Sequence, residues 1–154
     1  MSEYIIDLGQ RSKNASAELN KVETVAKDNF FGILIKNLDN NRDKIKSENA
    51  IDIKDGEKKG LTKAFLDRLL LTDSRIDGMI EGIEVVKNFR DPIGEIVEGF
   101  RHKKGMEIKK VRVPLGVIAM IYESRPNVSI DASILCLKAS SIKKLVLEKF
   151  TSFN

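Results

Sequence analysis

Apolar and charged residues alternate at a spacing of three to four positions along residues 1–90, and this stretch contains no proline. Such spacing places apolar side chains on one face of an α-helix. In "VETVAKDNFFGILIKNL", the residues predicted to form the buried stripe are Val25, Phe30, Leu34 and Leu38. The pattern therefore predicts a helical region over residues 1–90.

Two further helices are predicted after Gly60, which breaks the preceding pattern. The first should begin near Thr62 and turn its apolar residues inward; these are Phe65, Leu66, Leu69 and Leu70. Thr72 or Asp73 should cap the second, because a side-chain oxygen there accepts a hydrogen bond from a free backbone N–H. The inward face of this helix is formed by Ile76, Met79, Ile80 and Ile83.

Gly78 and Gly82 lie inside the second of these helices, where each costs about 1 kcal/mol relative to alanine. The sequence leaves two interpretations open. The glycines give room for a closely packed neighbour, or they mark a locally weak helix.

The pattern changes at Asp91-Pro92, because the residue before a proline is pushed toward extended geometry. The stretch "GEIVEGFRHKKGMEIKKVRVP" contains two extended runs around a polar turn with a glycine, which predicts a β-hairpin. Ile108, Val111 and Val113 alternate only imperfectly with polar residues.

An almost wholly apolar run over residues 115–122 predicts a parallel strand that is covered on both faces. A turn should follow, and then a helix over residues 129–138, with Asp131 in its first turn at the positive helix end. Strand, turn and helix open a βαβ unit. A short glycine turn and a second apolar strand should complete it, and "SIKKLVLEKF" supplies the apolar residues but no glycine.

The composition of the chain argues against several classes of function. At 154 residues, with 42% apolar and 32% charged residues, the chain is typical of a globular domain. No run approaches the ~20 apolar residues of a membrane span, and the amino terminus lacks a signal layout, so we expect a cytoplasmic protein. One cysteine and one histidine exclude a Cys/His zinc cage. The net charge is +4, but no tryptophan or tyrosine lies in the basic patches, so no nucleic-acid partner is expected.

Four segments together resemble gamma-glutamyl phosphate reductase, also called glutamate-5-semialdehyde dehydrogenase, of the aldehyde dehydrogenase superfamily. They are "NAIDI" at Asn49, "GLTKAFLDRLLLTDSRIDGM" at Gly60, "FRDPIGEI" at Phe89 and "KVRVPLGVIAMIYESRPNVSIDASILCLKAS" at Lys110. The resemblance covers residues 1 to about 140 and the amino-terminal part of the family only. It implies an α/β fold: a helical region (1–90), a β-hairpin or oligomerisation arm (91–113), and the truncated start of a Rossmann-like nucleotide-binding domain (114–154).

The resemblance also implies an activity. The family reduces L-glutamyl 5-phosphate to glutamate 5-semialdehyde with NADPH, a step of proline biosynthesis. The expected partners are this small-molecule substrate and further copies of the chain in a homo-oligomer, with no membrane.

The residues that follow the strand carry the expected site. In the family, a thiolate attacks the acyl phosphate and negative charge builds on the acyl oxygen; by the motif match, Asn127 donates to that oxygen and Pro126 holds it rigidly. Glu123, Ser124, Arg125 and Pro126 are expected to line the cofactor crevice, and Arg125 is a candidate partner for a phosphate or carboxylate. Judged without the resemblance, Asn127 is a common turn residue.

The chain departs from the family after Lys138, where the glycines of the next turn and loop are missing. The family's nucleophilic cysteine and catalytic domain lie beyond residue 154, so the chain is expected to be inactive alone. Cys136 is predicted to be a structural residue, and Lys138 to complement the end of its own helix. His102 is expected to be solvated, and no Gly-rich phosphate loop is present.

A second class of function stays open. The chain would then be a self-sufficient helical binding or scaffold domain without catalysis. A monodisperse, cooperatively melting monomer would favour that alternative.

Overall fold

Five helices occupy most of the region that the three-to-four spacing predicts to be helical. The computed structural model describes residues 3–122 and 125–147. The helices of this region are α1 (Glu3–Leu19), α2 (Thr24–Asn40), α3 (Arg42–Lys58), α4 (Lys63–Leu69) and α5 (Asp73–Asn88). The helical prediction is confirmed.

The buried face of α2 agrees with the predicted one at two of its four residues, because Leu38 is buried and Leu34 packs against the core. Phe31 is completely buried, whereas Phe30 is 49% exposed and Val25 is 67% exposed. Neighbouring residues of an α-helix point about 100° apart, so Phe30 faces away from the core when Phe31 enters it. Two adjacent phenylalanines leave this choice ambiguous locally, and the packing of α2 against α5 and α6 decides it.

The predicted start of α5 is confirmed. The Thr72 hydroxyl accepts a hydrogen bond from the backbone N–H of Arg75 at 3.2 Å, which is an N-cap. Ile76 and Ile83 on the predicted face are completely buried. In the shorter α4 the prediction holds only in part, because Leu70 leaves the helix in extended geometry and stays 40% exposed.

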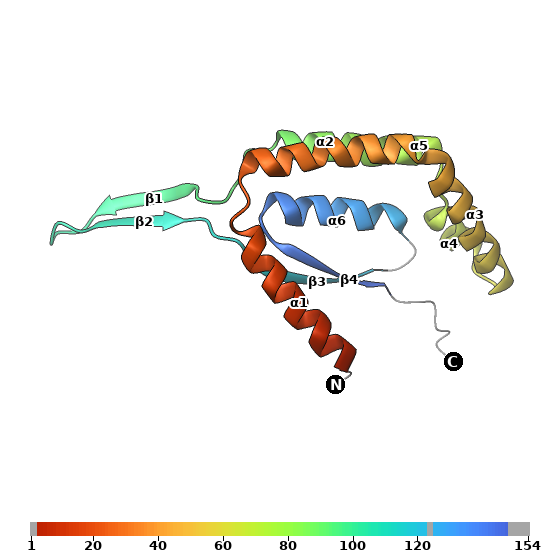
Figure 1. Ribbon diagram of the computed structural model, residues 1–154, viewed down its shortest axis with the longest axis horizontal. Coiled ribbons are helices and arrows are strands. Elements are labelled where there is room, and N and C mark those ends of the chain that lie inside the picture. The colour runs from red at the N-terminus through yellow and green to blue at the C-terminus, as the bar shows by residue number, and fades with distance from the viewer. Residues whose placement is uncertain (1–2, 123–124, 148–154) are drawn as a thin grey trace.

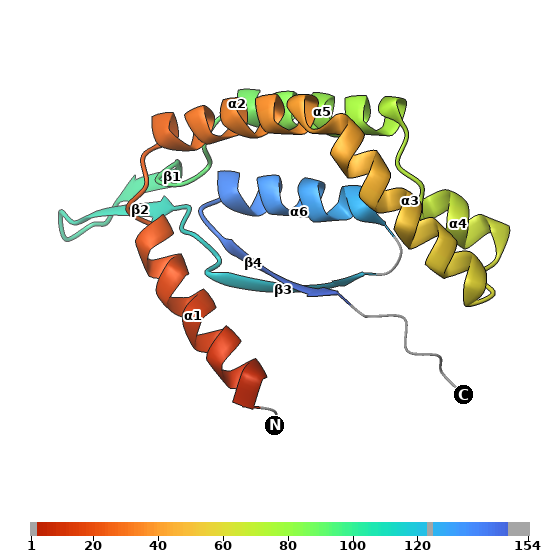
Figure 2. The same ribbon diagram turned by 45° about the vertical axis from the view of Figure 1, so that its right-hand side comes forward.

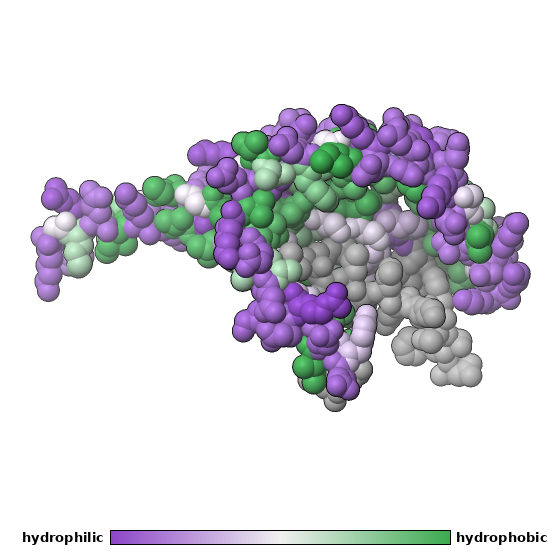
Figure 3. All heavy atoms as spheres, viewed as in Figure 1, coloured by the Kyte–Doolittle hydropathy of each residue, from purple (hydrophilic) through white to green (hydrophobic). Residues whose placement is uncertain are grey.

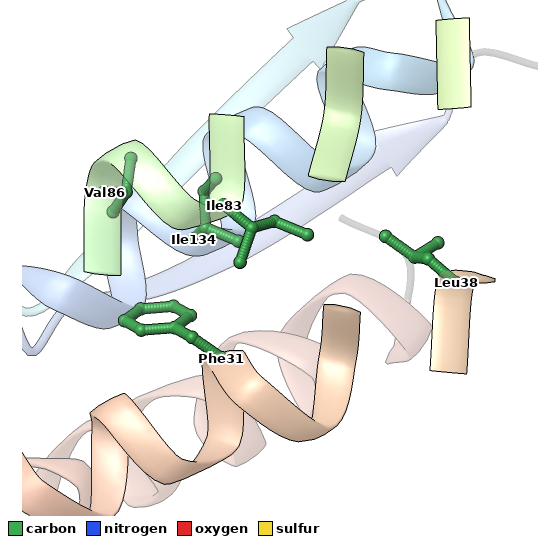
Figure 4. Packing of buried hydrophobic residues seen from close by; sticks show 5 residues of the cluster. All are labelled: Phe31, Leu38, Ile83, Val86 and Ile134. Carbon is green, nitrogen blue, oxygen red and sulfur yellow. The ribbon is translucent and has the colours of Figure 1, made fainter. Parts of the chain in front are cut away.

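The hydrophobic core joins α2, α5 and α6 (Pro126–Lys138). Its buried members are Phe31, Leu38, Ile83, Val86 and Ile134, which point toward one another in Figure 4. The α2–α5 pair forms one layer, α6 lies beneath it, and a parallel strand pair lies under α6 (Figures 1 and 2). Burial of these side chains stabilises the fold by about 1.5–3 kcal/mol each.

The strand pair and α6 form a βαβ unit. β3 (Val117–Tyr122) pairs in parallel with β4 (Ile142–Leu147), with Val117 opposite Ile142 and Tyr122 opposite Leu147. The second apolar strand is therefore confirmed. The coverage of β3 on both faces is not found, because Val117 and Ile121 are 39% and 68% exposed. Burial alternates along β3, so that one of its faces is less exposed than the other, and α1 contacts both strands.

A serine stands where a glycine turn was expected after α6. Ser140 has a φ of +48°, in the left-handed region that glycine favours. The N–H of Ser141 bonds to the carbonyl of Cys136 at 2.8 Å, and that of Ser140 to Leu137 at 3.0 Å. These two bonds form a Schellman C-cap, which ends α6 without glycine.

The predicted hairpin is confirmed as an antiparallel pair of β1 (Ile96–Arg101) and β2 (Glu107–Val111). Its turn uses Gly105 with a φ of +86°. The hairpin projects away from the helices in Figure 1, and Figure 3 shows apolar residues along its surface. Every residue of both strands is exposed.

Helices and strands together give a mixed fold with a helical amino-terminal region and a small antiparallel sheet. Within residues 3–122 and 125–147, no helix is both long enough and apolar enough to cross a membrane.

Candidate functional site

A cavity of about 370 Å³ lies where the first turn of α6 meets α4 and α5. Three arginines and two aspartates line it together with an amide and apolar residues. The lining residues are Asp67, Arg68, Leu70, Leu71, Arg75, Gly78, Met79, Arg125, Asn127 and Asp131. Segments about fifty residues apart in the sequence therefore form one charged cleft.

The first turn of α6 carries the residues expected at the site. The helix begins at Pro126, three residues earlier than predicted, and Arg125 is its N-cap residue. Proline is well suited to the first helical position, because its missing N–H would have no partner there. Asn127 thus belongs to the first turn of a helix and not to a separate turn.

The side chain of Asn127 lines the cavity and donates from Nδ2 to Oδ2 of Asp131 at 3.2 Å. Because α6 starts early, Asp131 lies in its second turn, and the predicted placement of Asp131 in the first turn is wrong. Asp131 packs toward α5 at Gly82, where an added Cβ would lie 3.8 Å from Oδ1. Gly82 therefore has a close neighbour, while Gly78 has open space next to it.

The other predicted site residues fall in three places. Arg125 is exposed and lines the cavity beside Asn127. Pro126 starts the helix but is not among the described residues that line the cavity. Glu123 and Ser124 lie outside the described residues.

Hydrogen bonds of Tyr122 and Arg75 hold α6 and the carboxyl end of α4 in place. The hydroxyl groups of Tyr122, at the end of β3, and Ser129, in α6, are hydrogen-bonded, which joins strand and helix across the turn. Arg75 donates from Nη1 to the carbonyls of Asp67 and Leu70 and from Nη2 to the Asp67 carboxylate at 3.0 Å. Arg75 therefore fixes the carboxyl end of α4 and neutralises Asp67.

Asn49 is a positioning residue that the sequence did not single out. It is 4% exposed, donates to the carbonyl of Leu69 at 2.9 Å and accepts from the N–H of Leu71 at 2.7 Å. These bonds fix the α4–α5 connection that lines the cavity. The segment "NAIDI" was the available signal, because it is one of the four stretches that resemble the reductase family.

Ion pairs fix α3 to the start of α5. Lys46 bonds to Asp73 at 2.8 Å, and Arg42 to Asp77 at 2.7 Å. The hydrogen bond from Lys46 lowers the pKa of Asp73 and raises that of Lys46. The pKa of Arg42 is raised by its hydrogen bonds to Asp39 and Asp77. These ion pairs are accessible to water, so we expect each of them to contribute little to the free energy of unfolding.

Three residues considered from the sequence lie away from the cavity. Cys136 is 7% exposed in α6, nine residues after Asn127, which is about 13 Å along the helix axis. Lys138 is buried and donates to the carbonyl of Lys87 and to Asp28 at 2.8 and 2.9 Å, so it caps α5 and not its own helix. His102 is exposed in the hairpin turn, where its Nδ1 accepts from the N–H of Lys104. In the described ranges, no cluster of three or more His, Cys, Asp or Glu side chains could hold a metal ion.

Two solved reductase structures are similar to the structure of this chain. A crystal structure of gamma-glutamyl phosphate reductase from Thermotoga maritima matches 90% of this chain with a TM-score of 0.85 and 35% identity, and the match covers 33% of that chain. The same enzyme from Saccharomyces cerevisiae matches 90% of this chain with a TM-score of 0.84 and 26% identity, over 36% of that chain.

Curated relatives carry the same name. Gamma-glutamyl phosphate reductase of Francisella philomiragia is 47% identical over 137 residues, which are 89% of this chain and 33% of the relative. That of Desulforamulus reducens is 44% identical over 135 residues, 88% of this chain and 32% of the relative. No family model matches. The chain is a homologue of gamma-glutamyl phosphate reductases over about nine-tenths of its length, which confirms the resemblance, and it spans about one third of their length.

Proposed function

We propose that the chain forms part of a gamma-glutamyl phosphate reductase, which reduces L-glutamyl 5-phosphate to glutamate 5-semialdehyde with NADPH in proline biosynthesis. The observation that carries this proposal is the 47% identity over 137 residues to a curated reductase. Within the larger enzyme, the chain would contribute the amide of Asn127 and the first βα(β) of a Rossmann-like nucleotide-binding domain.

The role of Asn127 follows from the charge changes of the reaction. A thiolate attacks the acyl carbon, the bond from that carbon to the phosphate oxygen breaks, and inorganic phosphate leaves. A hydride then reduces the thioester carbon, and the aldehyde forms as the thiolate leaves. In both stages negative charge develops on the acyl oxygen, and a neutral N–H donor lowers both barriers.

The environment of Asn127 supports this role. Its Nδ2 carries two hydrogens, and the bond to Asp131 uses one of them. The second is left for an oxygen in the cavity that Asn127 lines.

The residues before Asn127 complete the proposed crevice. Arg125 faces the same cavity and is suited to a phosphate or carboxylate, which a guanidinium binds through two parallel N–H groups. By resemblance, Glu123, Ser124 and Pro126 line the crevice at the carboxyl end of β3.

The nicotinamide cofactor would supply the hydride, and its choice as NADPH rests on the family. The described residues do not by themselves fit a whole dinucleotide. The cavity at α6 has a volume of about 370 Å³ and is lined by residues of α4, α5 and α6, and the sequence has no Gly-rich phosphate loop. The rest of the cofactor site would therefore come from other parts of the enzyme.

The nucleophile must also come from elsewhere. Cys136 is the single cysteine of the chain, it is buried, and it lies about 13 Å along α6 from Asn127. A thiolate at that position cannot reach a carbonyl held by the Asn127 amide. We therefore expect no reductase turnover from the 154-residue chain alone.

The proposal includes assembly and location. The hairpin over residues 91–113 would serve as an oligomerisation arm between copies of the enzyme in the cytoplasm. Its cross-strand neighbours Phe100 and Ile108 are 54% and 41% exposed and lie opposite each other, which gives the arm an apolar contact surface. The division into domains at residues 90 and 113 stays a prediction.

A chimera tests the proposed function. Residues 1–141 would replace the matching part of the Francisella philomiragia reductase, and NADPH oxidation would be measured with L-glutamyl 5-phosphate. We expect an active chimera, and a 10²- to 10³-fold lower kcat when Asn127→Ala removes the amide donor.

The matched control is Asn14→Ala, which removes an exposed amide of α1 whose oxygen accepts from Gln10. It should leave kcat unchanged. An inactive but folded chimera, or an Asn127→Ala chimera with unchanged kcat, would contradict the proposal.

A further inference from the structure

Asp131 is a carboxylate in the cavity that forms no ion pair with the described side chains. Among the described residues, it accepts a hydrogen bond from the neutral amide of Asn127 at 3.2 Å, and none of the ion pairs includes it. It is half-buried between α6 and α5. Because it is partly removed from water, a cationic partner in the cavity would stabilise its charge.

The helix does not provide that compensation. The positive end of a helix dipole acts within the first turn, and Asp131 lies in the second turn of α6. The other aspartate of the cavity differs, because Asp67 is paired with Arg75 at 3.0 Å. Among the described residues, Asp131 is thus the carboxylate of this cavity without an ion pair, and Arg125 is a guanidinium of this cavity without one.

We propose that Asp131 binds the α-ammonium group of an amino-acid substrate. This inference rests on the proposed function, whose substrate carries one cationic group, the α-ammonium, besides its anionic carboxylate and phosphate. Arg125 then pairs with one of the anionic groups. The cavity offers room beside Gly78, where an added Cβ would meet no atom within 4 Å.

The position of Asp131 beside Asn127 gives a second reason. An unpaired carboxylate close to the Asn127 amide repels negative charge that develops on an oxygen held there. A bound ammonium group removes that repulsion. Asp131 therefore selects an acyl compound that carries an amino group, and it disfavours the same compound without one.

Ligand titrations of the 154-residue chain, followed by NMR of its backbone amides, test the inference without requiring turnover. The probes are L-glutamate, N-acetyl-L-glutamate and glutarate, the last two of which lack the ammonium group. L-glutamate should shift the amide resonances of Gly78, Asn127 and Asp131, with a Kd about tenfold lower than that of either other probe.

Variants assign the preference to one side chain. Asp131→Asn should abolish the tenfold preference, Asp131→Glu should retain part of it, and Asp7→Asn, on the exposed surface of α1, should retain all of it. The dispersion of amide resonances shows that each variant is folded. Equal Kd values for the three probes, an unchanged preference in Asp131→Asn, or no saturable shifts in the folded chain would overturn the inference. If the inference fails in this way but the chimera is active, the proposed reductase function still holds. If the chimera is inactive but the ligand preference is present, the proposed function is wrong and the ammonium site remains.

Discussion

Lys27 shows at the scale of one residue how distant parts of the chain are joined. Its side chain is 2% exposed, and its Nζ donates to Asp91 and to Ser140, both at 2.7 Å. These partners lie 64 and 113 positions away in the sequence. The buried charge therefore connects the start of α2, the base of the hairpin and the end of α6.

Asp91 gives this connection a defined pH dependence. Burial tends to raise the pKa of Asp91, but hydrogen bonds from Lys27, the N–H of Ile93 and Thr24 together hold it below its usual value. A carboxyl whose pKa falls on folding stabilises the folded state above its unfolded pKa of about 3.9. That stability is lost as the pH falls through the lower, folded pKa.

We predict that Asp91→Asn lowers the free energy of unfolding by about 3 kcal/mol at pH 7, because Lys27 loses its counter-charge. The difference from the unsubstituted chain should shrink below pH 4. Urea denaturation at pH 7 and pH 3 measures both values, with Asp7→Asn as the exposed control. A difference that is the same at both pH values would contradict the role of the ionised carboxylate.

At the scale of elements, α5 is the helix whose start and buried face could be predicted together. The Thr72 cap and the run of Ile76, Met79 and Ile83 point to the same boundaries. Local chemistry and tertiary packing agree there, and this agreement made the prediction reliable.

We predict that Thr72→Ala lowers the free energy of unfolding by about 1 kcal/mol, because the N–H of Arg75 loses its acceptor. Thr62→Ala is the matched control, since Thr62 occupies the same position in α4 but makes no side-chain cap bond. Thermal unfolding of both variants gives the comparison. Equal losses would mean that the Thr72 hydroxyl does not act as a cap.

The elements that were mispredicted depend on contacts distant in sequence. Phe30 and Phe31 fit a helical stripe equally well in the sequence, and α5 and α6 decide which is buried. The start of α6 was placed too late because a proline was taken as part of a turn, although it suits a first helical position. Coverage of β3 on both faces was inferred from its apolar run, and its environment supplies only one covered face.

At the scale of the molecule, only some of the residues that line the cavity could be predicted from the sequence. Arg125 and Asn127 follow directly from the motif after β3. Asp67, Arg68 and Arg75 do not, because α4 and α5 reach the cavity only once the core has formed. Their segment, "GLTKAFLDRLLLTDSRIDGM", stood out only through its resemblance to the reductases.

The exposed apolar hairpin predicts concentration-dependent self-association of the chain. Replacing the cross-strand pair with Phe100→Thr and Ile108→Thr keeps β-forming residues but removes apolar area. Sedimentation velocity should then show less of the associated species. Val25→Thr, at a residue of α2 that is 67% exposed, is the control. Unchanged association in the double variant would place the contact elsewhere, and a monomer at all concentrations would favour a scaffold domain.

The contact between α1 and the strand pair has a consequence for protein synthesis. The first described helix touches β4, the last described strand, so its docking surface does not exist until residue 147 has left the ribosome. The hairpin and the α2–α5 pair need no such delay, because their contacts are closer in sequence. During translation α1 therefore stays undocked while the middle of the chain folds.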